Sequence, residues 1–383
     1  MNIDHASLVI IREYLDEMMY ALVDLRLSFE VPPGPTGFPK FQSLQQILKR
    51  LNPKHQVIFR LFRLGESVDH ASVTSAVPQK VLNALTTLGL LSKTGTEWRT
   101  PDMLIVPAEG LYLLVGVPSS YPTASHPCRI WFDLSSHVVA KALPVSLSGL
   151  RVLDICSGSG IQLLLCAARG AAHGIGLELS EEAVKTARAN SILNGLDHKV
   201  EFRQSNLLDS LKDGEQFDFV VCNTPYAPVV YAAQAPVALE SIGNSVLLEL
   251  LDKLPAYLSA GSRGILATWR AIGRQSSTYQ MEFISQRLEE RGFSTFAFVD
   301  RAPDTMEGVL RILQTDLEQR PDMDAGQVEE TLGRVKDLLQ GSGGKMDGFY
   351  NQLIYLRKGK IESAGAERAI CGLAAPVLVG AAQ

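Results

Sequence analysis

Cysteine is scarce in this chain, and long hydrophobic runs are missing. The 383 residues include only five cysteines, with no C-x-x-C pair among them, which argues against a disulfide framework and against a zinc site. No bound metal is therefore expected. Residues 1–20 contain four acidic side chains, so they lack the pattern of a signal peptide. No apolar run approaches the ~20 residues that a membrane-spanning helix requires, and we expect a soluble, cytoplasmic protein without a membrane partner.

Positive charge is also in short supply. The 36 Lys and Arg residues are outnumbered by 41 Asp and Glu residues, which gives a net charge of −5. Such a balance disfavours non-specific coating of nucleic acid, because phosphate contacts require Lys and Arg. The deficit is uneven, since residues 40–100 contain nine basic and three acidic side chains. The length and an ordinary globular composition, with 46% hydrophobic residues, indicate two or three domains.

The first 117 residues are predicted to form a helical and winged-helix-like domain. Residues 1–30 place apolar side chains at helical spacing and end at a proline-rich turn. Helical patterns and then extended stretches follow, at residues 41–51, 54–64, 78–88, 96–99, 103–106 and 111–115. The basic side chains of this domain either contact nucleic acid or form the solvated face of a dimerisation or substrate-covering module. The second alternative is favoured.

A connector at residues 118–148 leads to a region in which short β-runs alternate with helices. Seven β-runs are predicted, at residues 151–155, 174–179, 200–203, 217–222, 264–269, 295–299 and 349–356. Alternation of this kind predicts a parallel sheet covered on both faces. The region extends over residues 149–360, with a charged helical insertion at 303–347, and a flexible tail is expected at 361–383.

Polar side chains follow four successive predicted strands. The run D-I-C-S-G-S-G from Asp154 to Gly160 joins a buried strand to an apolar helix, and its glycines let the backbone approach a ligand closely. Glu178 ends the second strand, where its carboxylate can accept both hydroxyls of a ribose. Asn206 and Asn223 follow the third and fourth strands. The ends of parallel strands are where open α/β sheets bind ligands.

In these motifs, residues 150–300 resemble class I S-adenosylmethionine-dependent methyltransferases. They are most similar to the N-P-P-Y-motif branch that includes glutamine N5-methyltransferases and the "small-domain" RNA guanine methyltransferases. The resemblance implies a Rossmann-like seven-stranded sheet and S-adenosyl-L-methionine as the cofactor, with Glu178 at the ribose and Asn206 facing the adenine. The implied cofactor-binding residues are Asp154, Ser157, Gly158, Gly160, Glu178, Leu179, Asn206, Leu207 and Asn223. Two positions depart from the family pattern: Cys156 replaces a glycine, and Asn206 replaces an acid.

The fourth motif is Asn223-Thr224-Pro225-Tyr226. In the resembling family, the Asn side chain and the next backbone carbonyl accept hydrogen bonds from a planar amine or amide, and the aromatic ring stacks on it. By that resemblance Asn223, Pro225 and Tyr226 are the catalytic candidates, with Thr224 in place of the first proline. We therefore expect methyl transfer to a planar nitrogen. Alternatively the motif only closes a turn, and transfer to oxygen or carbon uses other residues.

Three functions remain open. The favoured one is methylation of a small-molecule substrate, for example in specialised-metabolite biosynthesis, which suits the acidic chain and an insertion able to wall off a pocket. The alternative is methylation of RNA guanine or of a protein glutamine, which suits the fourth motif and the basic segment. A non-enzymatic DNA-binding regulator is disfavoured by the intact motifs. A nucleic-acid partner is not favoured, and the N-terminal amphipathic helix leaves a homodimer open.

Overall fold

The computed structural model describes the chain with several gaps. The described residues are 2–34, 37–118, 120–125, 130–225, 245–273, 279–299, 305–318, 324–340 and 348–359. They belong to two units, the first comprising Met1–Lys141 with Ser157–Asn206 and the second Ala142–Cys156 with Leu207–Gln383. The predicted tail at 361–383 lies outside the described residues. The predicted domain boundaries remain a prediction.

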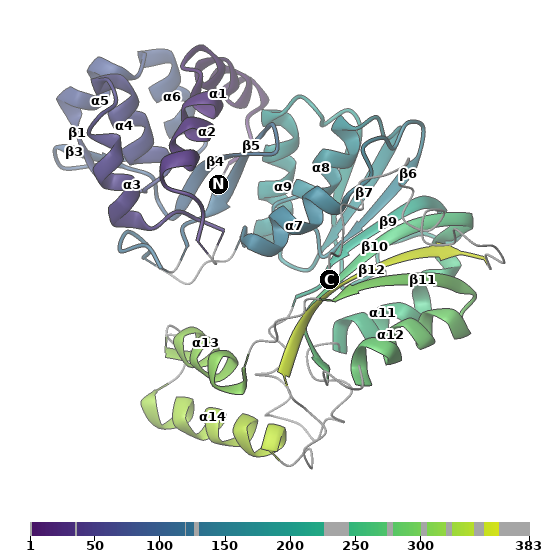
Figure 1. Ribbon diagram of the computed structural model, residues 1–383. Helices are drawn as coiled ribbons and strands as arrows, with labels where there is room; N and C mark the ends of the chain where they lie inside the picture. Colours follow the sequence, from purple (N-terminus) through teal and green to yellow (C-terminus); the bar gives the residue numbers. More distant parts are fainter. Residues whose placement is uncertain are drawn as a thin grey trace. The chain divides into compact units, whose positions relative to one another are not determined.

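The first unit begins with helices and small sheets (Figure 1). The helices are α1 (His5–Glu17), α2 (Tyr20–Glu30), α3 (Phe41–Leu48), α4 (Pro53–Phe62), α5 (His70–Ala76) and α6 (Gln79–Thr87). The strands β1 (Val68–Asp69), β2 (Ser92–Thr94) and β3 (Glu97–Arg99) form a sheet of order β1-β3-β2, and β4 (Met103–Ala108) pairs antiparallel with β5 (Leu111–Gly116). The winged-helix interpretation of this segment remains a prediction.

The prediction of a single helix over residues 1–30 is wrong, because these residues form the two helices α1 and α2. Met19 has a left-handed backbone with φ +48°, and this conformation cannot continue a right-handed helix. The second helix turns Tyr20 into the core, where its ring is fully buried and lies 4.6 Å from the ring of Phe59. Its hydroxyl donates to the carbonyl of Ile105 in β4. The elements α2, α4 and β4 therefore pack together in one core.

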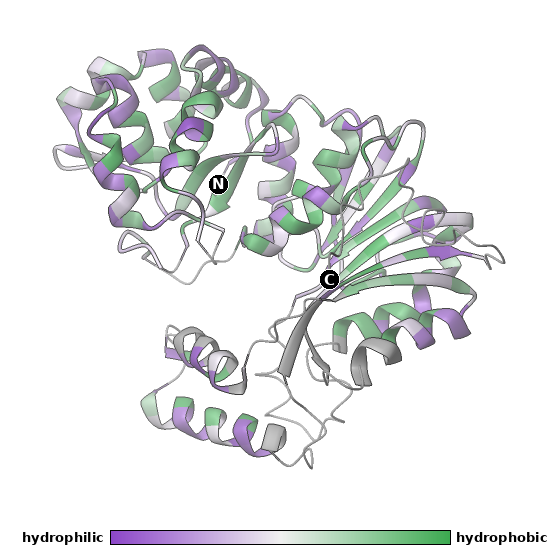
Figure 2. Cartoon of the chain, in the orientation of Figure 1, coloured by the Kyte–Doolittle hydropathy of each residue, from purple (hydrophilic) through white to green (hydrophobic). Residues whose placement is uncertain are grey.

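The same unit also contains an αβ segment. Its elements are α7 (Leu134–Ala142), α8 (Ile161–Ala168), β7 (His173–Glu178), α9 (Glu181–Leu193) and β8 (Val200–Gln204). Every residue of α8 from Ile161 to Ala167 is buried, and Figure 2 shows this helix as mainly hydrophobic. β7 and β8 run parallel, with Glu178 paired to Gln204. α9 packs against both β5 and α1, so the helix that follows Glu178 is built into the N-terminal part of the unit.

The strands from β6 to β12 form a seven-stranded sheet of order β11-β12-β10-β9-β6-β7-β8. The strands not yet given are β6 (Arg151–Ile155), β9 (Phe217–Asn223), β10 (Leu258–Gly273), β11 (Phe293–Val299) and β12 (Gly348–Lys358). β9 runs parallel to β6 and to β10, whereas β12 runs antiparallel to β10 and β11. The prediction of a Rossmann-like seven-stranded α/β fold is confirmed. The positions of the strands agree closely with the predicted β-runs, apart from a much longer β10.

Further helices belong to the second unit. They are α11 (Ser245–Lys253), the short η2 (Leu254–Tyr257), α12 (Tyr279–Glu290), α13 (Met306–Glu318) and α14 (Ala325–Gln340). α12 packs on β10 and β11, while α13 and α14 contact each other and lie in the chain between β11 and β12. Within the described ranges, no helix has the length and apolar content needed to cross a bilayer.

Candidate functional site

The loop between β6 and α8 takes an unusual backbone path. Cys156, Gly158 and Gly160 all have left-handed backbones, with φ of +59°, +51° and +83°. Nothing lies within 4 Å of the position that a Cβ on Gly158 would occupy, so the backbone there is open to a ligand. A Cβ on Gly160 would lie 2.7 Å from Cζ of Phe202, which only glycine avoids. The left-handed backbone of Cys156 explains why the family pattern has glycine at this position.

The carboxylate of Glu178 is held by this loop. Its Oε2 accepts a hydrogen bond from the backbone N–H of Gly158 at 3.0 Å, and its Oε1 accepts one from the N–H of Ser180 at 2.9 Å. Ser180 also caps α9, because its side chain accepts from the N–H of Ala183. A carboxylate oxygen can accept more than one hydrogen bond. Both oxygens of the half-buried Glu178 therefore keep capacity for the two hydroxyls of a ribose.

The ends of β7 and β8 lie level with each other. The N–H of Ser205 donates to the carbonyl of Glu178 at 2.8 Å, and Gln204 donates to the carbonyl of Leu179 at 3.2 Å. Leu179 is 65% exposed, a large apolar side chain offered to solvent beside the carboxylate. Asn206 is exposed two residues beyond β8, while the side chain of Leu207 is buried. The structure thus groups Glu178, Leu179 and Asn206 at one end of this strand pair.

The second unit holds the remaining candidates. Asp154 in β6 is almost completely buried and pairs with Val221 of β9. Asn223 ends β9, is half-buried and pairs with Ala267 of β10. Pro225 is exposed, and Tyr226 lies outside the described residues.

Thr224 is the departure from the N-P-P-Y pattern, and the structure gives it a role. Its side chain is buried, and both its N–H and its Oγ1 donate to the carbonyl of Ala267, at 3.2 and 2.5 Å. A proline here would make neither bond. Threonine therefore ties the turn after Asn223 to β10 with two hydrogen bonds to a single carbonyl.

These residues fit S-adenosyl-L-methionine. The open backbone at Gly158 and the carboxylate of Glu178 suit the amino-acid and ribose parts of the cofactor. The Oγ of Ser157 is buried and has no hydrogen-bond partner among the residues that the structure describes, so it is an unsatisfied polar group inside the same loop. Over the described ranges, no cluster of three or more His, Cys, Asp or Glu side chains is arranged to hold a metal ion.

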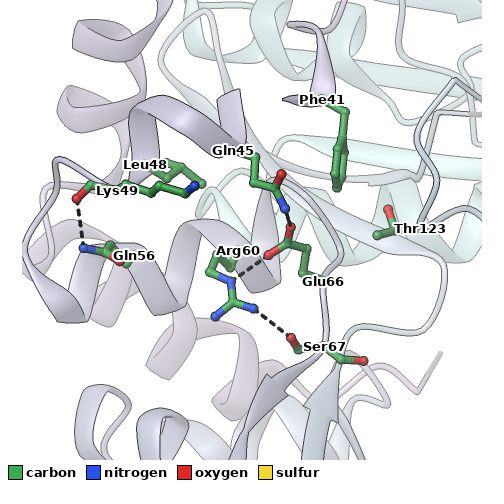
Figure 3. A pocket seen from close by; sticks show the side chains of 9 residues that line it. All are labelled: Phe41, Gln45, Leu48, Lys49, Gln56, Arg60, Glu66, Ser67 and Thr123. Carbon is green, nitrogen blue, oxygen red and sulfur yellow. Dashed lines mark hydrogen bonds and ion pairs between the residues drawn. The ribbon is translucent and has the colours of Figure 1, made fainter. Parts of the chain in front are cut away.

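A pocket of about 510 Å³ lies elsewhere in the first unit, against α3 and α4 (Figure 3). The carboxylate of Glu66 accepts from Gln45 and from Arg60, at 2.6 Å in each case, and Arg60 also donates to the carbonyl of Ser67. These charged groups are already paired with one another. The pocket contains none of the predicted site residues.

The basic segment at residues 40–100 is partly neutralised. Arg60 pairs with Glu66, Arg50 with Glu30, and the buried Arg63 with Asp24 at 2.7 Å. α6 is also covered by α1, and the hydroxyl of Tyr14 donates to the carbonyl of Ala76 just before α6. Three of the nine cations are therefore paired with carboxylates, although only Arg63 is buried, so the nucleic-acid interpretation is weakened only slightly.

Sequence reasoning missed one residue that touches the glycine loop. Asn190 of α9 is completely buried, and its Nδ2 donates to the carbonyl of Ser159 at 2.9 Å. The signal was an asparagine on the inward face of a helix, one turn before a second asparagine, Asn194. Buried amides are rarely placed without hydrogen-bond partners.

A seven-stranded sheet with a glycine loop after its first strand and an acid at the end of the second is typical of the Rossmann-like, class I S-adenosylmethionine-dependent methyltransferases. Residues 146–289 match a family model described as a methyltransferase domain. Residues 146–289 therefore form a class I methyltransferase domain with S-adenosyl-L-methionine as its cofactor, similar to the branch that includes protein glutamine methyltransferases. The prediction of a class I methyltransferase and the prediction of its cofactor are both confirmed.

The chain is similar to proteins that methylate ribosomal proteins. It is 29% identical over 144 residues to a ribosomal protein L11 methyltransferase of Lactobacillus johnsonii, which covers 38% of this chain and 37% of that one. It is 31% identical over 144 residues to a ribosomal protein uL3 glutamine methyltransferase of Bordetella pertussis, covering 35% and 47%. The match spans less than half the length of either relative.

A similarity to one solved structure is more distant in sequence. A methyltransferase from Thiobacillus denitrificans in complex with S-adenosyl-L-homocysteine is 16% identical, with a TM-score of 0.35, and the similarity covers 59% of this chain and 91% of that one.

Proposed function

We propose that the protein transfers the methyl group of S-adenosyl-L-methionine to the side-chain amide nitrogen of a glutamine in a protein. The observation that carries this proposal is Asn223, a half-buried amide at the end of β9 whose following turn is tied to β10 through Thr224. The names of the relatives, which specify ribosomal protein and glutamine methylation, support it. The small-molecule acceptor favoured from the sequence has no support among these relatives.

In this proposal the cofactor lies along the strand ends. Glu178 binds the ribose hydroxyls, Asn206 accepts from the adenine amino group, and Leu179 packs on the adenine. The methionine part lies against the glycine loop. The residues assigned to the cofactor are Asp154, Ser157, Gly158, Gly160, Glu178, Leu179, Asn206 and Leu207, whereas Asn223, which the sequence also assigned to the cofactor, is proposed to act on the acceptor. When bound, the cofactor supplies an electrophilic methyl group, so that the chain need only bind and orient the acceptor and exclude water.

The acceptor is oriented by the fourth motif. The side-chain oxygen of Asn223 accepts a hydrogen bond from an N–H of the planar acceptor amide, which turns the nitrogen toward the methyl group. The hydrogen bonds from Thr224 to the Ala267 carbonyl limit the movement of the turn. We further propose that the ring of Tyr226 stacks on the plane of the acceptor amide. Transfer forms a nitrogen–carbon bond, breaks the sulfur–carbon bond and releases one N–H proton.

The test is to incubate the full chain with labelled S-adenosyl-L-methionine and ribosomal proteins, and to locate the methyl group by mass spectrometry of proteolytic peptides. The proposal expects label on a glutamine side chain, and expects a synthetic peptide with asparagine at that position not to accept. Label in the RNA or in small molecules, with none on protein, would contradict it.

A further inference from the structure

We propose that Asn190 is a positioning residue that links the N-terminal β4–β5 hairpin to the glycine loop, so that cofactor affinity depends on this hairpin. The inference rests on the cofactor site proposed above. All the residues involved lie in the first unit, within Met1–Lys141 and Ser157–Asn206.

Asn190 uses both ends of its side-chain amide. Its Oδ1 accepts from the N–H of Leu114 in β5 at 2.7 Å, and its Nδ2 donates to the carbonyl of Leu114 at 3.1 Å. The same Nδ2 donates to the carbonyl of Ser159 at 2.9 Å. The side chain is completely buried, where water cannot replace a lost partner. One amide therefore joins β5, α9 and the loop.

Asn194 makes the same pair of bonds one turn further along. Its Oδ1 accepts from the N–H of Tyr112 at 2.9 Å, and its Nδ2 donates to the carbonyl of Tyr112 at 2.7 Å. β5 pairs with β4 along one edge. At its other edge, the backbone groups of Tyr112 and Leu114 bond to the two asparagines as they would to a neighbouring strand. Asn194, however, has no hydrogen bond to the loop among the described contacts.

Ser159 lies between the two loop glycines with left-handed backbones, a conformation that glycine adopts with little restraint of its own. Hydrogen bonds to residues outside the loop restrain it: the Ser157 N–H donates to the carbonyl of Leu177, the Gly158 N–H donates to Glu178, and the Ser159 carbonyl accepts from Asn190. Glu178 and Asn190 lie on either side of the Ser180 cap, on β7 and α9. Removing the Asn190 amide takes away the restraint on Ser159 and leaves buried backbone groups of Leu114 unpaired. Removing the Asn194 amide leaves the contact to Ser159 intact.

The experiment measures binding of S-adenosyl-L-homocysteine to the full chain by calorimetry, with thermal unfolding recorded in parallel. Asn190→Ala is expected to weaken binding about tenfold, the loss typical of one buried hydrogen bond. Asn194→Ala, the matched control, is expected to lower the melting temperature but to change affinity by less than about twofold. Wild-type affinity in Asn190→Ala, or an equal loss in both variants, would overturn the inference.

A second variant covers the case in which Asn190→Ala does not fold. Asn190→Asp keeps an oxygen for the Leu114 N–H but loses the donor to Ser159 while its carboxyl is ionised. Its affinity relative to wild type is therefore expected to recover as the pH is lowered and the buried carboxyl takes up a proton. A constant ratio would contradict the inference. Glu178→Ala separates the two proposals: unchanged affinity in that variant contradicts the cofactor site itself, whereas its loss with Asn190→Ala unchanged contradicts only the link.

Discussion

The backbone N–H of Gly158 donates to Oε2 of Glu178 at 3.0 Å. Because Gly158 is in the loop before α8 and Glu178 ends β7, this bond joins the two motifs that the sequence separates by 20 residues. It presents the carboxylate beside an open stretch of backbone. The acid and the glycine loop therefore form one structural feature within the first unit.

The first prediction concerns Glu178. Glu178→Ala is expected to weaken binding of S-adenosyl-L-homocysteine by at least about tenfold, since it removes charged hydrogen bonds of roughly 1.5–3 kcal/mol. Glu181→Ala serves as the control, because this acid is exposed on α9 and pairs only with Lys185 among the described contacts. Calorimetry on both variants measures the difference. Equal affinities in the two variants would contradict the assignment.

Substitution of Gly160 by any residue with a Cβ is predicted to lower the stability of the fold. Gly160→Ala places a Cβ 2.7 Å from Phe202 Cζ and 3.1 Å from Ala187 Cβ, with φ at +83°, and should cost roughly 2–4 kcal/mol of stability in urea unfolding. Gly195→Ala has a similar φ of +65° but open space around it, so it should cost only about 1 kcal/mol. Adding Phe202→Leu to Gly160→Ala should recover part of the loss. Similar costs at both glycines would show that the clash is not the cause.

His137 is predicted to make stability depend on pH. Burial lowers its pKa, against the opposing effect of Glu109 at 3.7 Å, while Lys141 and Arg63 add to the lowering. The unfolded chain then binds a proton more readily than the folded chain, so stability rises with pH in this window. The contribution is fully present above about pH 6.5, the ordinary histidine value, and is lost as the pH falls through the folded pKa.

His137→Gln should flatten this dependence in urea unfolding between about pH 5 and 7.5. Wild type and variant are compared at each pH, and a variant with an unchanged slope would contradict the role of His137. The substitution leaves Phe132 in place, whose ring lies edge-on to the His137 ring with the two ring centroids 4.7 Å apart.

Thr224 is predicted to stabilise the turn that follows Asn223. Thr224→Val keeps the shape and the backbone N–H but loses the Oγ1 bond to Ala267, and should cost about 1 kcal/mol or somewhat more because the group is buried. Turnover should fall while cofactor affinity stays unchanged. Thr268→Val, which removes a buried hydroxyl bonded to Gln352, is the control for a stability loss in the same sheet. Unchanged turnover in Thr224→Val would contradict the positioning role.

The local pattern of apolar residues in the sequence was sufficient to predict where most strands of the seven-stranded sheet lie. The β-runs predicted at 151–155 and 217–222 appear as Arg151–Ile155 and Phe217–Asn223, because buried parallel strands leave continuous apolar runs in the sequence. The short α5 was missed, since seven residues give too little periodicity. The break at Met19 was missed because nothing in its type requires a left-handed backbone.

The candidate site was predictable only where a strand end carries an unusual residue. Glu178 and Asn223 stand out in the sequence for that reason. Asn190 does not, because its partners Leu114 and Ser159 lie 76 and 31 residues away, and such contacts depend on how the helix packs. The part that Thr224 plays is equally hidden, since its partner Ala267 is 43 residues further on.

In the proposed function, Asn223 orients a planar amide for methylation. The most direct measurement compares wild type with Asn223→Ala for both S-adenosyl-L-homocysteine affinity and the rate of methyl transfer to a glutamine-containing ribosomal protein. We expect transfer to fall by at least about a hundredfold, the loss of a well-placed orienting group, while the affinity changes only a few-fold. Transfer at the wild-type rate with unchanged affinity would contradict it.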